Sequence, residues 1–152
     1  MRTLGNILWH VPFLGFLNAF VTFIIGGLFV ITVVGAPIGL GLIQLSKFLL
    51  TPFSCGMINK RDINPNQNQA WKTFGTIVRI LYFPFGLILA AVTILQVAAL
   101  FITIVGIPVA LVLAKSLGTF FNPVNKTCVS RAVSEEVASR KAKAQVDQAF
   151  SA

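Results

Sequence analysis

The chain has few acidic residues and a single histidine, which narrows the chemistry that it can perform. Its carboxylates, Asp62, Glu135, Glu136 and Asp147, all lie in polar segments, and His10 is far from them in sequence. General acid–base catalysis needs two titratable groups held close together, and a proton relay needs ionisable groups inside the membrane. We therefore expect no enzyme activity, no metal site and no cofactor, and we interpret His10 as a polar side chain at an interface.

Cysteine is also scarce, with Cys55 and Cys128 as its two occurrences. Structural zinc takes four ligands, so two thiols without a nearby histidine do not predict a zinc site. On the cytoplasmic side of a membrane both should be reduced thiols, and acylation close to the membrane is the alternative.

Charge is missing from two long stretches, Leu4 to Ser46 and Ile80 to Ala114, which contain no Asp, Glu, Lys or Arg. Hydrophobic residues make up 56% of the chain and charged residues 11%, and the mean hydropathy is +0.86. These values exclude an ordinary soluble domain. A helix crosses the hydrocarbon layer in about 20 residues, so each stretch is long enough to cross, turn and start back. The sequence predicts an all-α membrane protein.

Two similar phrases occur in these stretches, ITVVGAP at 31–37 and ITIVGIP at 102–108. A shift of 71 positions aligns them together with several other Gly, Thr and Pro residues. The further aligned pairs include Gly15 with Gly86, Thr22 with Thr93, and Pro52 with Pro123. The sequence therefore predicts an internal duplication of one membrane unit.

Each unit contains a Gly-x-Pro step, at Gly35 and Pro37 and again at Gly106 and Pro108. Proline lacks the N–H that a helix interior needs and disfavours helix in the preceding residue, while glycine fits tight turns. Each step predicts a turn between the two arms of a helical hairpin. The expected arms are residues 13–34 and 38–50, then 85–105 and 109–121. The second arms are short, so four full spans, or two spans with partial or re-entrant arms, both remain open.

Positive charge predicts the orientation of the hairpins. Ten of the 12 lysines and arginines lie at the N-terminus, in the central polar segment or after residue 125, away from both Gly-x-Pro steps. Lysine and arginine are enriched in cytoplasmic segments, so we expect both termini and the linker in the cytoplasm. The two tandem hairpins should then have the same orientation, related by a pseudo-twofold axis along the membrane normal.

The expected organisation has four parts. They are a first membrane repeat (1–58), a cytoplasmic linker (59–74), a second membrane repeat (75–125) and a cytoplasmic tail (126–152). The tail is either an exposed amphipathic helix or partly disordered.

The net charge of +8 is explained more simply by anionic lipid headgroups than by nucleic acid, for which the sequence has no motif. The expected partners are membrane lipids and a cytoplasmic partner that binds the linker and tail. Small residues at a spacing of four, such as Gly35 and Gly39, favour close helix packing, and we expect a homo-oligomer.

Polar residues inside the apolar stretches are the candidate site. Lys47 and Lys115, with Gln44 and Gln96, are candidates for lining a pore or a lipid-phosphate pocket in an oligomer. The alternatives are lysines that extend to the membrane surface and glutamines that hydrogen-bond between helices.

Several motifs together carry a family resemblance. They are GNILW at 5–9, the two Ile-Thr-x-Val-Gly-x-Pro phrases, Asn64-Pro65 in the linker, and GTIV at 75–78. Over about residues 1–130 the chain resembles the YccF family of bacterial inner-membrane proteins, whose inner-membrane component domain is duplicated. The resemblance implies a small multi-pass protein of the bacterial inner membrane, with an uncharacterised activity and no catalytic residues to transfer.

Two functions follow from the sequence as hypotheses. In the first, an oligomeric channel or transport component carries ions, with anions favoured, or small solutes. In the second, a non-conducting scaffold or accessory subunit binds a partner or anionic lipid.

Overall fold

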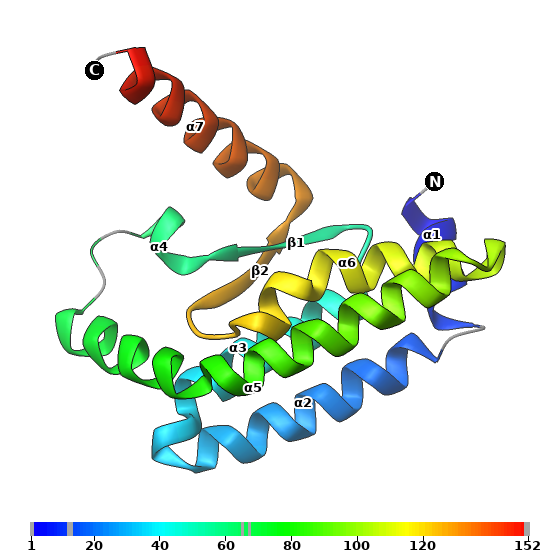
Figure 1. The fold of residues 1–152 in the computed structure, drawn as a ribbon, viewed down its shortest axis with the longest axis horizontal. Coiled ribbons are helices and arrows are strands. Elements are labelled where there is room, and N and C mark those ends of the chain that lie inside the picture. The colour runs from blue at the N-terminus through cyan, green and yellow to red at the C-terminus, as the bar shows by residue number, and fades with distance from the viewer. Residues whose placement is uncertain (1, 12–13, 65, 67, 151–152) are drawn as a thin grey trace.

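The computed structural model describes residues 2–11, 14–64, 66 and 68–150, most of them helical. In chain order the elements are α1 (Arg2–His10), α2 (Gly15–Ile31), the 3₁₀ turn η1 (Val33–Gly35), α3 (Ala36–Leu50), β1 (Cys55–Asn59), α4 (Lys60–Ile63), α5 (Gln69–Phe101), the 3₁₀ turn η2 (Ile104–Gly106), α6 (Ile107–Phe121), β2 (Lys126–Ser130) and α7 (Arg131–Phe150) (Figure 1). Phe13, the expected start of the first span, and Pro65, part of the family resemblance, lie outside the described residues.

The turn η1 joins α2 to α3, and its backbone satisfies its own hydrogen bonds. The Gly35 N–H donates to the Thr32 carbonyl at 2.9 Å, and the Thr32 hydroxyl donates to the Phe29 carbonyl at 2.8 Å. A Cβ at Gly35 would overlap both Thr32 and Phe29, so only glycine fits there. Pro37 stands in the first turn of α3, where a missing N–H removes no helix bond.

The turn η2 joins α5 to α6 in the same way. The Gly106 N–H donates to the Thr103 carbonyl at 3.0 Å, and the Thr103 hydroxyl donates to the Leu100 carbonyl at 3.1 Å. Pro108 stands in the first turn of α6. The shorter arms α3 and α6 have 15 residues each, a length of about 22 Å at about 1.5 Å per residue.

Helix α5 has 33 residues and contains Pro84. It begins at Gln69, inside the segment expected to be a linker, and the Asn68 side chain caps it by accepting a hydrogen bond from the Ala70 N–H at 3.1 Å. In the first half of the chain, by contrast, separate helices α1 and α2 precede the turn, and Leu14 has a left-handed φ of 50° before α2.

Strands β1 and β2 form a two-stranded antiparallel sheet, in which Cys55 faces Ser130 and Asn59 faces Lys126. The Lys60 N–H donates to the Asn125 carbonyl at 2.9 Å, and the Arg131 N–H donates to the Ser54 carbonyl at 3.0 Å, which closes both ends. The sheet corrects the expectation of an all-α protein. Five-residue strands are stable only when paired, and the sequence gave no signal that these two segments meet.

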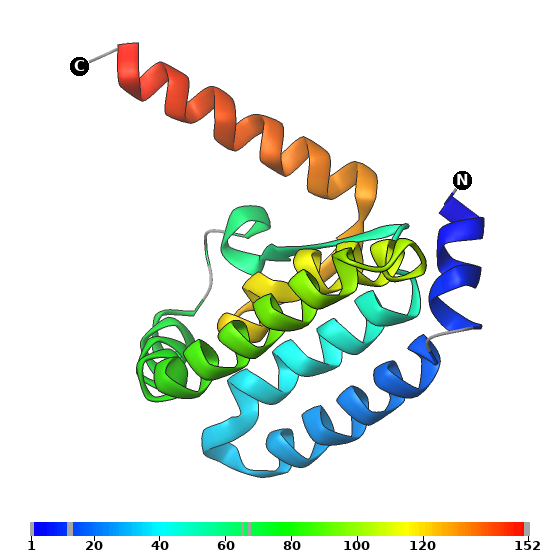
Figure 2. The same cartoon turned by 45° about the vertical axis from the view of Figure 1, so that its right-hand side comes forward.

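The two hairpins point in opposite directions, which corrects the expected same orientation. The turn η1 lies beside residues 78–85 of α5, whereas the first residues of α6 lie beside Trp9 and Leu49. Both views show the two turns at opposite ends of the helical layer (Figures 1 and 2). The physical reason is the sheet: each strand follows α3 or α6 after a few residues, so antiparallel strands require antiparallel helices.

The molecule has one apolar side and one polar side. Helices α2 and α5 expose most of the large hydrophobic side chains, whereas buried residues of α3 and α6, such as Leu45, Phe48 and Val112, form the core. The sheet, α4 and α7 lie on the other side, and α7 projects away from the body (Figure 2). Two segments, Val33–Leu50 and Gln69–Phe101, are long and apolar enough to cross a membrane, and α2 and α6 are shorter apolar helices.

Candidate functional site

A hollow of about 570 Å³ lies between α4 and the first third of α5, and we call it the basic groove. Its lining residues are Arg61, Gln69, Lys72, Thr73, Thr76 and Ile77. Arg61 comes from α4, and the others come from successive turns of α5. Lys72 and Thr76 are four residues apart, so they share a helix face.

The two threonines of the groove are held in place by their own helix. The Thr73 hydroxyl donates to the Gln69 carbonyl at 3.1 Å, and the Thr76 hydroxyl donates to the Lys72 carbonyl at 2.8 Å. Their protons are therefore engaged. Arg61 and Lys72 supply the charged N–H donors of the groove.

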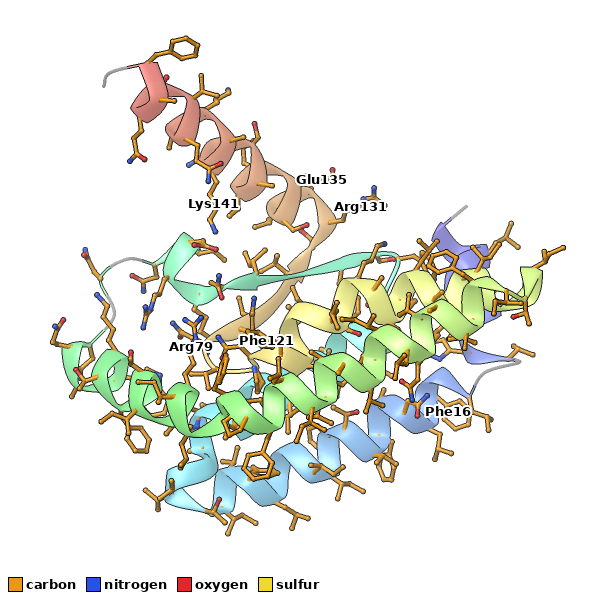
Figure 3. All side chains as sticks on the ribbon, in the orientation of Figure 1. Phe16, Arg79, Phe121, Arg131, Glu135 and Lys141 are labelled. Carbon is orange, nitrogen blue, oxygen red and sulfur yellow. The ribbon has the colours of Figure 1, made fainter. Side chains whose placement is uncertain are left out.

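A smaller hollow of about 130 Å³ adjoins the groove, and Arg61 and Thr76 line both. Arg79 and Asn125 also line this smaller hollow, and Arg79 is labelled on α5 in Figure 3. Asp62 borders it too, but its carboxylate is paired with Lys141 of α7 at 2.7 Å.

Positive charge is concentrated around this end of the sheet. Burial lowers the pKa of Lys126, and the nearby Lys141 and Arg79 lower it further, while Asp62 opposes the shift. A neutralising anion would relieve the repulsion among these cations. The combination of guanidinium and ammonium donors suits the oxygen atoms of a phosphate group.

The groove also borders the apolar side of the molecule. Trp71 and Ile77, both on α5, are exposed beside the basic residues. Tryptophan collects at the boundary between headgroups and hydrocarbon. The groove therefore lies where a headgroup phosphate would be found if the apolar side faces lipid.

The four polar residues singled out in the sequence are not gathered in one place. Gln44 on α3 supports the sheet, because its Oε1 accepts hydrogen bonds from the Cys128 N–H at 3.2 Å and the Thr127 hydroxyl at 3.5 Å. Lys115 on α6 is exposed, with its Nζ 5.2 Å from the centre of the Phe53 ring.

Lys47 and Gln96 occupy separate positions. Lys47 is exposed on α3 and is close enough to Cys128 for its charge to favour the thiolate. Gln96 is exposed on α5 and lines a different hollow, of about 620 Å³, with Asn18 and Thr22. The structure thus places Gln44, Lys47 and Lys115 on the two helices under the sheet and Gln96 away from them.

The basic groove was missed because its residues were assigned to a polar loop. Lys72, Thr76 and Arg79 are spaced by four and three residues, the period of one helix face. That spacing was the available signal. Arg61 could not be added from the sequence, since its position depends on β1 and α4.

These features define a membrane-associated helical protein with an exposed apolar side and a basic polar side. Residues 4–54, from α1 to the turn before β1, match the family model YccF, described as an inner membrane component domain. This part of the chain is therefore a YccF domain, and the predicted family is confirmed there. The match and the apolar helices together point to a membrane location.

No curated protein matches the chain, and no solved structure matches it.

Proposed function

We propose that the protein is a membrane-embedded platform that binds anionic phosphate headgroups in the basic groove. The observation that carries this proposal is the joint placement of Arg61, Lys72 and Arg79 around two adjoining hollows at the border of the apolar side. Juxtamembrane basic residues are attracted to anionic lipid by about 1 kcal/mol each. Three such residues held by folded elements give a defined site in addition to general attraction.

The proposed orientation places the sheet side in the bacterial cytoplasm and α2 and α5 in hydrocarbon. The start of α1, the sheet and α7 lie on the same side of the helical layer (Figure 1), and most of the basic residues belong to these elements, α4 and the start of α5. The turns support partial insertion, because Val33 is 80% exposed and Ile104 86% exposed. Such apolar tips suit hydrocarbon, and their backbone groups are already paired.

The proposed evolutionary origin is an internal duplication whose two units are arranged head to tail. Three observations support it: η2, α6 and β2 each begin and end 71 residues after η1, α3 and β1. The sheet pairs Met57 with Cys128, also 71 residues apart, so a pseudo-twofold axis would pass through this pair. The Trp9 ring N–H donates to the Leu49 carbonyl at 2.7 Å, and the Tyr82 hydroxyl to the Phe120 carbonyl at 3.3 Å.

Native mass spectrometry of the detergent-purified protein tests the headgroup site. Phosphatidylglycerol should be retained in preference to phosphatidylcholine, and an R61Q/K72Q/R79Q variant should lose that preference. The matched control R131Q/R140Q/K143Q removes three cations from α7, away from the groove, and should keep it. Equal retention of both lipids by the unaltered protein, or loss of the preference in the control as well, would overturn the proposal.

A second function is favoured by one observation. Asn18, Thr22 and Gln96 line a hollow among otherwise apolar helices, as the wall of a solute path in an oligomer would require. Flux from proteoliposomes, compared among wild type, Gln96→Leu, Lys47→Ala and Lys115→Ala, tests it. Absence of flux from an oligomeric wild-type preparation would exclude this channel function under the conditions used.

A further inference from the structure

The two strands bring three sulfur atoms to one face of the sheet. Met57 lies directly opposite Cys128 in the register, and Cys55 precedes Met57 by two residues. Side chains two residues apart on a strand point to the same face. All three side chains are half-buried and pack against the core cluster that contains Leu45 and Phe48.

The two thiols are also in contact. Cys55 and Cys128 share a hydrogen bond, and the Cys55 Sγ lies 3.2 Å from the Thr51 hydroxyl oxygen. Burial and the neighbouring Cys55 raise the pKa of the Cys128 thiol to about 12, so this thiol is protonated at neutral pH. Lys47, close to Cys128, stabilises negative charge at the same place.

We propose that Cys55, Met57 and Cys128 form a binding site for a soft monovalent metal ion of the Cu(I) class. Two thiolates and a thioether are the ligands that select Cu(I) over harder cations. Zinc would require a fuller ligand set, and among the described residues there is no group of three or more His, Cys, Asp or Glu side chains that could hold a metal. The site joins the two halves of the chain, because β1 and β2 each supply a thiol.

Binding exchanges protons for the metal. One Cu(I) ion displaces the proton of each thiol, so two protons leave and the site changes from neutral to a net charge of −1. Lys47 on α3 lies near enough to offset this charge. No electron is transferred, and copper remains Cu(I) throughout.

A disulfide is the competing use of the two thiols. The register places Cys55 opposite Ser130 and Cys128 opposite Met57, so the two cysteines are diagonal neighbours and not a facing pair. Disulfides require a restricted separation of the two Cβ atoms, and a disulfide would also need an oxidant. The experiment below includes this outcome.

The test is an anaerobic titration of the purified, detergent-solubilised protein with Cu(I) in competition with the chromogenic chelator bicinchoninate. One Cu(I) per chain should bind, with an ultraviolet thiolate-to-copper charge-transfer band. Cys55→Ser and Cys128→Ser should each weaken binding by more than about tenfold, because each removes one of two thiolate ligands. Met57→Leu should weaken it less, and the control Ile58→Leu, on the opposite face of the same strand, should not change it.

A second measurement needs no variant. Ag(I), a probe of the same ligand preference, should protect both cysteines of the wild-type protein from iodoacetamide, as read by mass spectrometry. Unchanged alkylation in Ag(I), copper binding that persists in folded C55S/C128S protein, or a Cys55–Cys128 disulfide in protein purified from a reducing cytoplasm would each overturn the proposal.

Discussion

At the scale of single residues, the closest approach between the two halves of the chain is at Gly41. This glycine of α3 faces the backbone of Pro123, the residue that leads from α6 toward β2, and a Cβ at Gly41 would overlap the Pro123 carbonyl. Pro123 is itself fully buried. The contact therefore has no flexible side chain that can move aside.

Gly41→Ala should destabilise the protein by about 1–3 kcal/mol, the usual range for overpacking a tight contact. The matched control is Gly27→Ala in α2, where a Cβ would meet nothing within 4 Å. This control should be neutral or stabilising by up to about 1 kcal/mol, because alanine favours helix over glycine. Thermal unfolding in detergent measures both, and equal stability of the two variants would contradict the tight packing.

Gln44→Leu should destabilise the protein by about 1–3 kcal/mol, because it leaves the partly buried Cys128 N–H without its acceptor. Gln96→Leu is the control, since Gln96 is exposed on α5. Unfolding of the two variants under the same conditions gives the comparison. A larger loss for Gln96→Leu would mean that Gln44 does not support the sheet.

At the scale of secondary structure, α7 is joined to the body by the strands and by one ion pair that crosses to α4. Lys141 points from α7 toward α4 (Figure 3), and its ammonium group lies 2.7 Å from the Asp62 carboxylate. The other ion pairs of α7, Arg131 with Glu135 and Arg140 with Glu136, lie within the helix itself.

Lys141→Gln should release α7 from α4 with little effect on global stability, about 1 kcal/mol or less, because ion pairs of this exposure are weak. Hydrogen exchange in Lys60–Ile63 should become faster. Arg140→Gln breaks only a pair within α7, so it should leave exchange in α4 unchanged. Unchanged exchange in the Lys141 variant would show that the pair does not hold the two helices together.

The sequence indicated some elements and not others, for physical reasons. The turns η1 and η2 contain the glycines of both Gly-x-Pro steps, because proline and glycine act locally. The helix at Arg131–Phe150 was one of two expected forms of the tail. The strands were missed, because a five-residue strand depends on a partner far away in sequence.

At the scale of the whole molecule, the opposite directions of the hairpins determine which surface can meet lipid. The positive-inside rule counts charges in loops and assumes that each apolar run crosses the membrane. It contains no information about a sheet that forces α3 and α6 to be antiparallel. The candidate site depended on the same arrangement, since Arg61 and Arg79 meet only after β1 and α4 are placed.

Both hairpin tips should be inaccessible to a membrane-impermeant maleimide from either side of the membrane. Val33→Cys and Ile104→Cys, in protein whose native cysteines are serine, test this because both positions are exposed in the structure but apolar in surroundings. Lys143→Cys on α7 is the control and should react from the cytoplasmic side alone. Labelling of a tip from the periplasm would instead indicate hairpins that cross the membrane.

The pairing of β1 with β2 has a consequence for biosynthesis. When Asn59 leaves the ribosome β1 is complete, yet its partner is complete only at Ser130, 71 residues later. At about 5–20 residues per second this interval lasts roughly 4–14 s, during which the nascent first half carries an unpaired strand edge that other chains can bind. A product that terminates early, before Lys126, would retain that edge permanently and should be cleared by quality-control proteases.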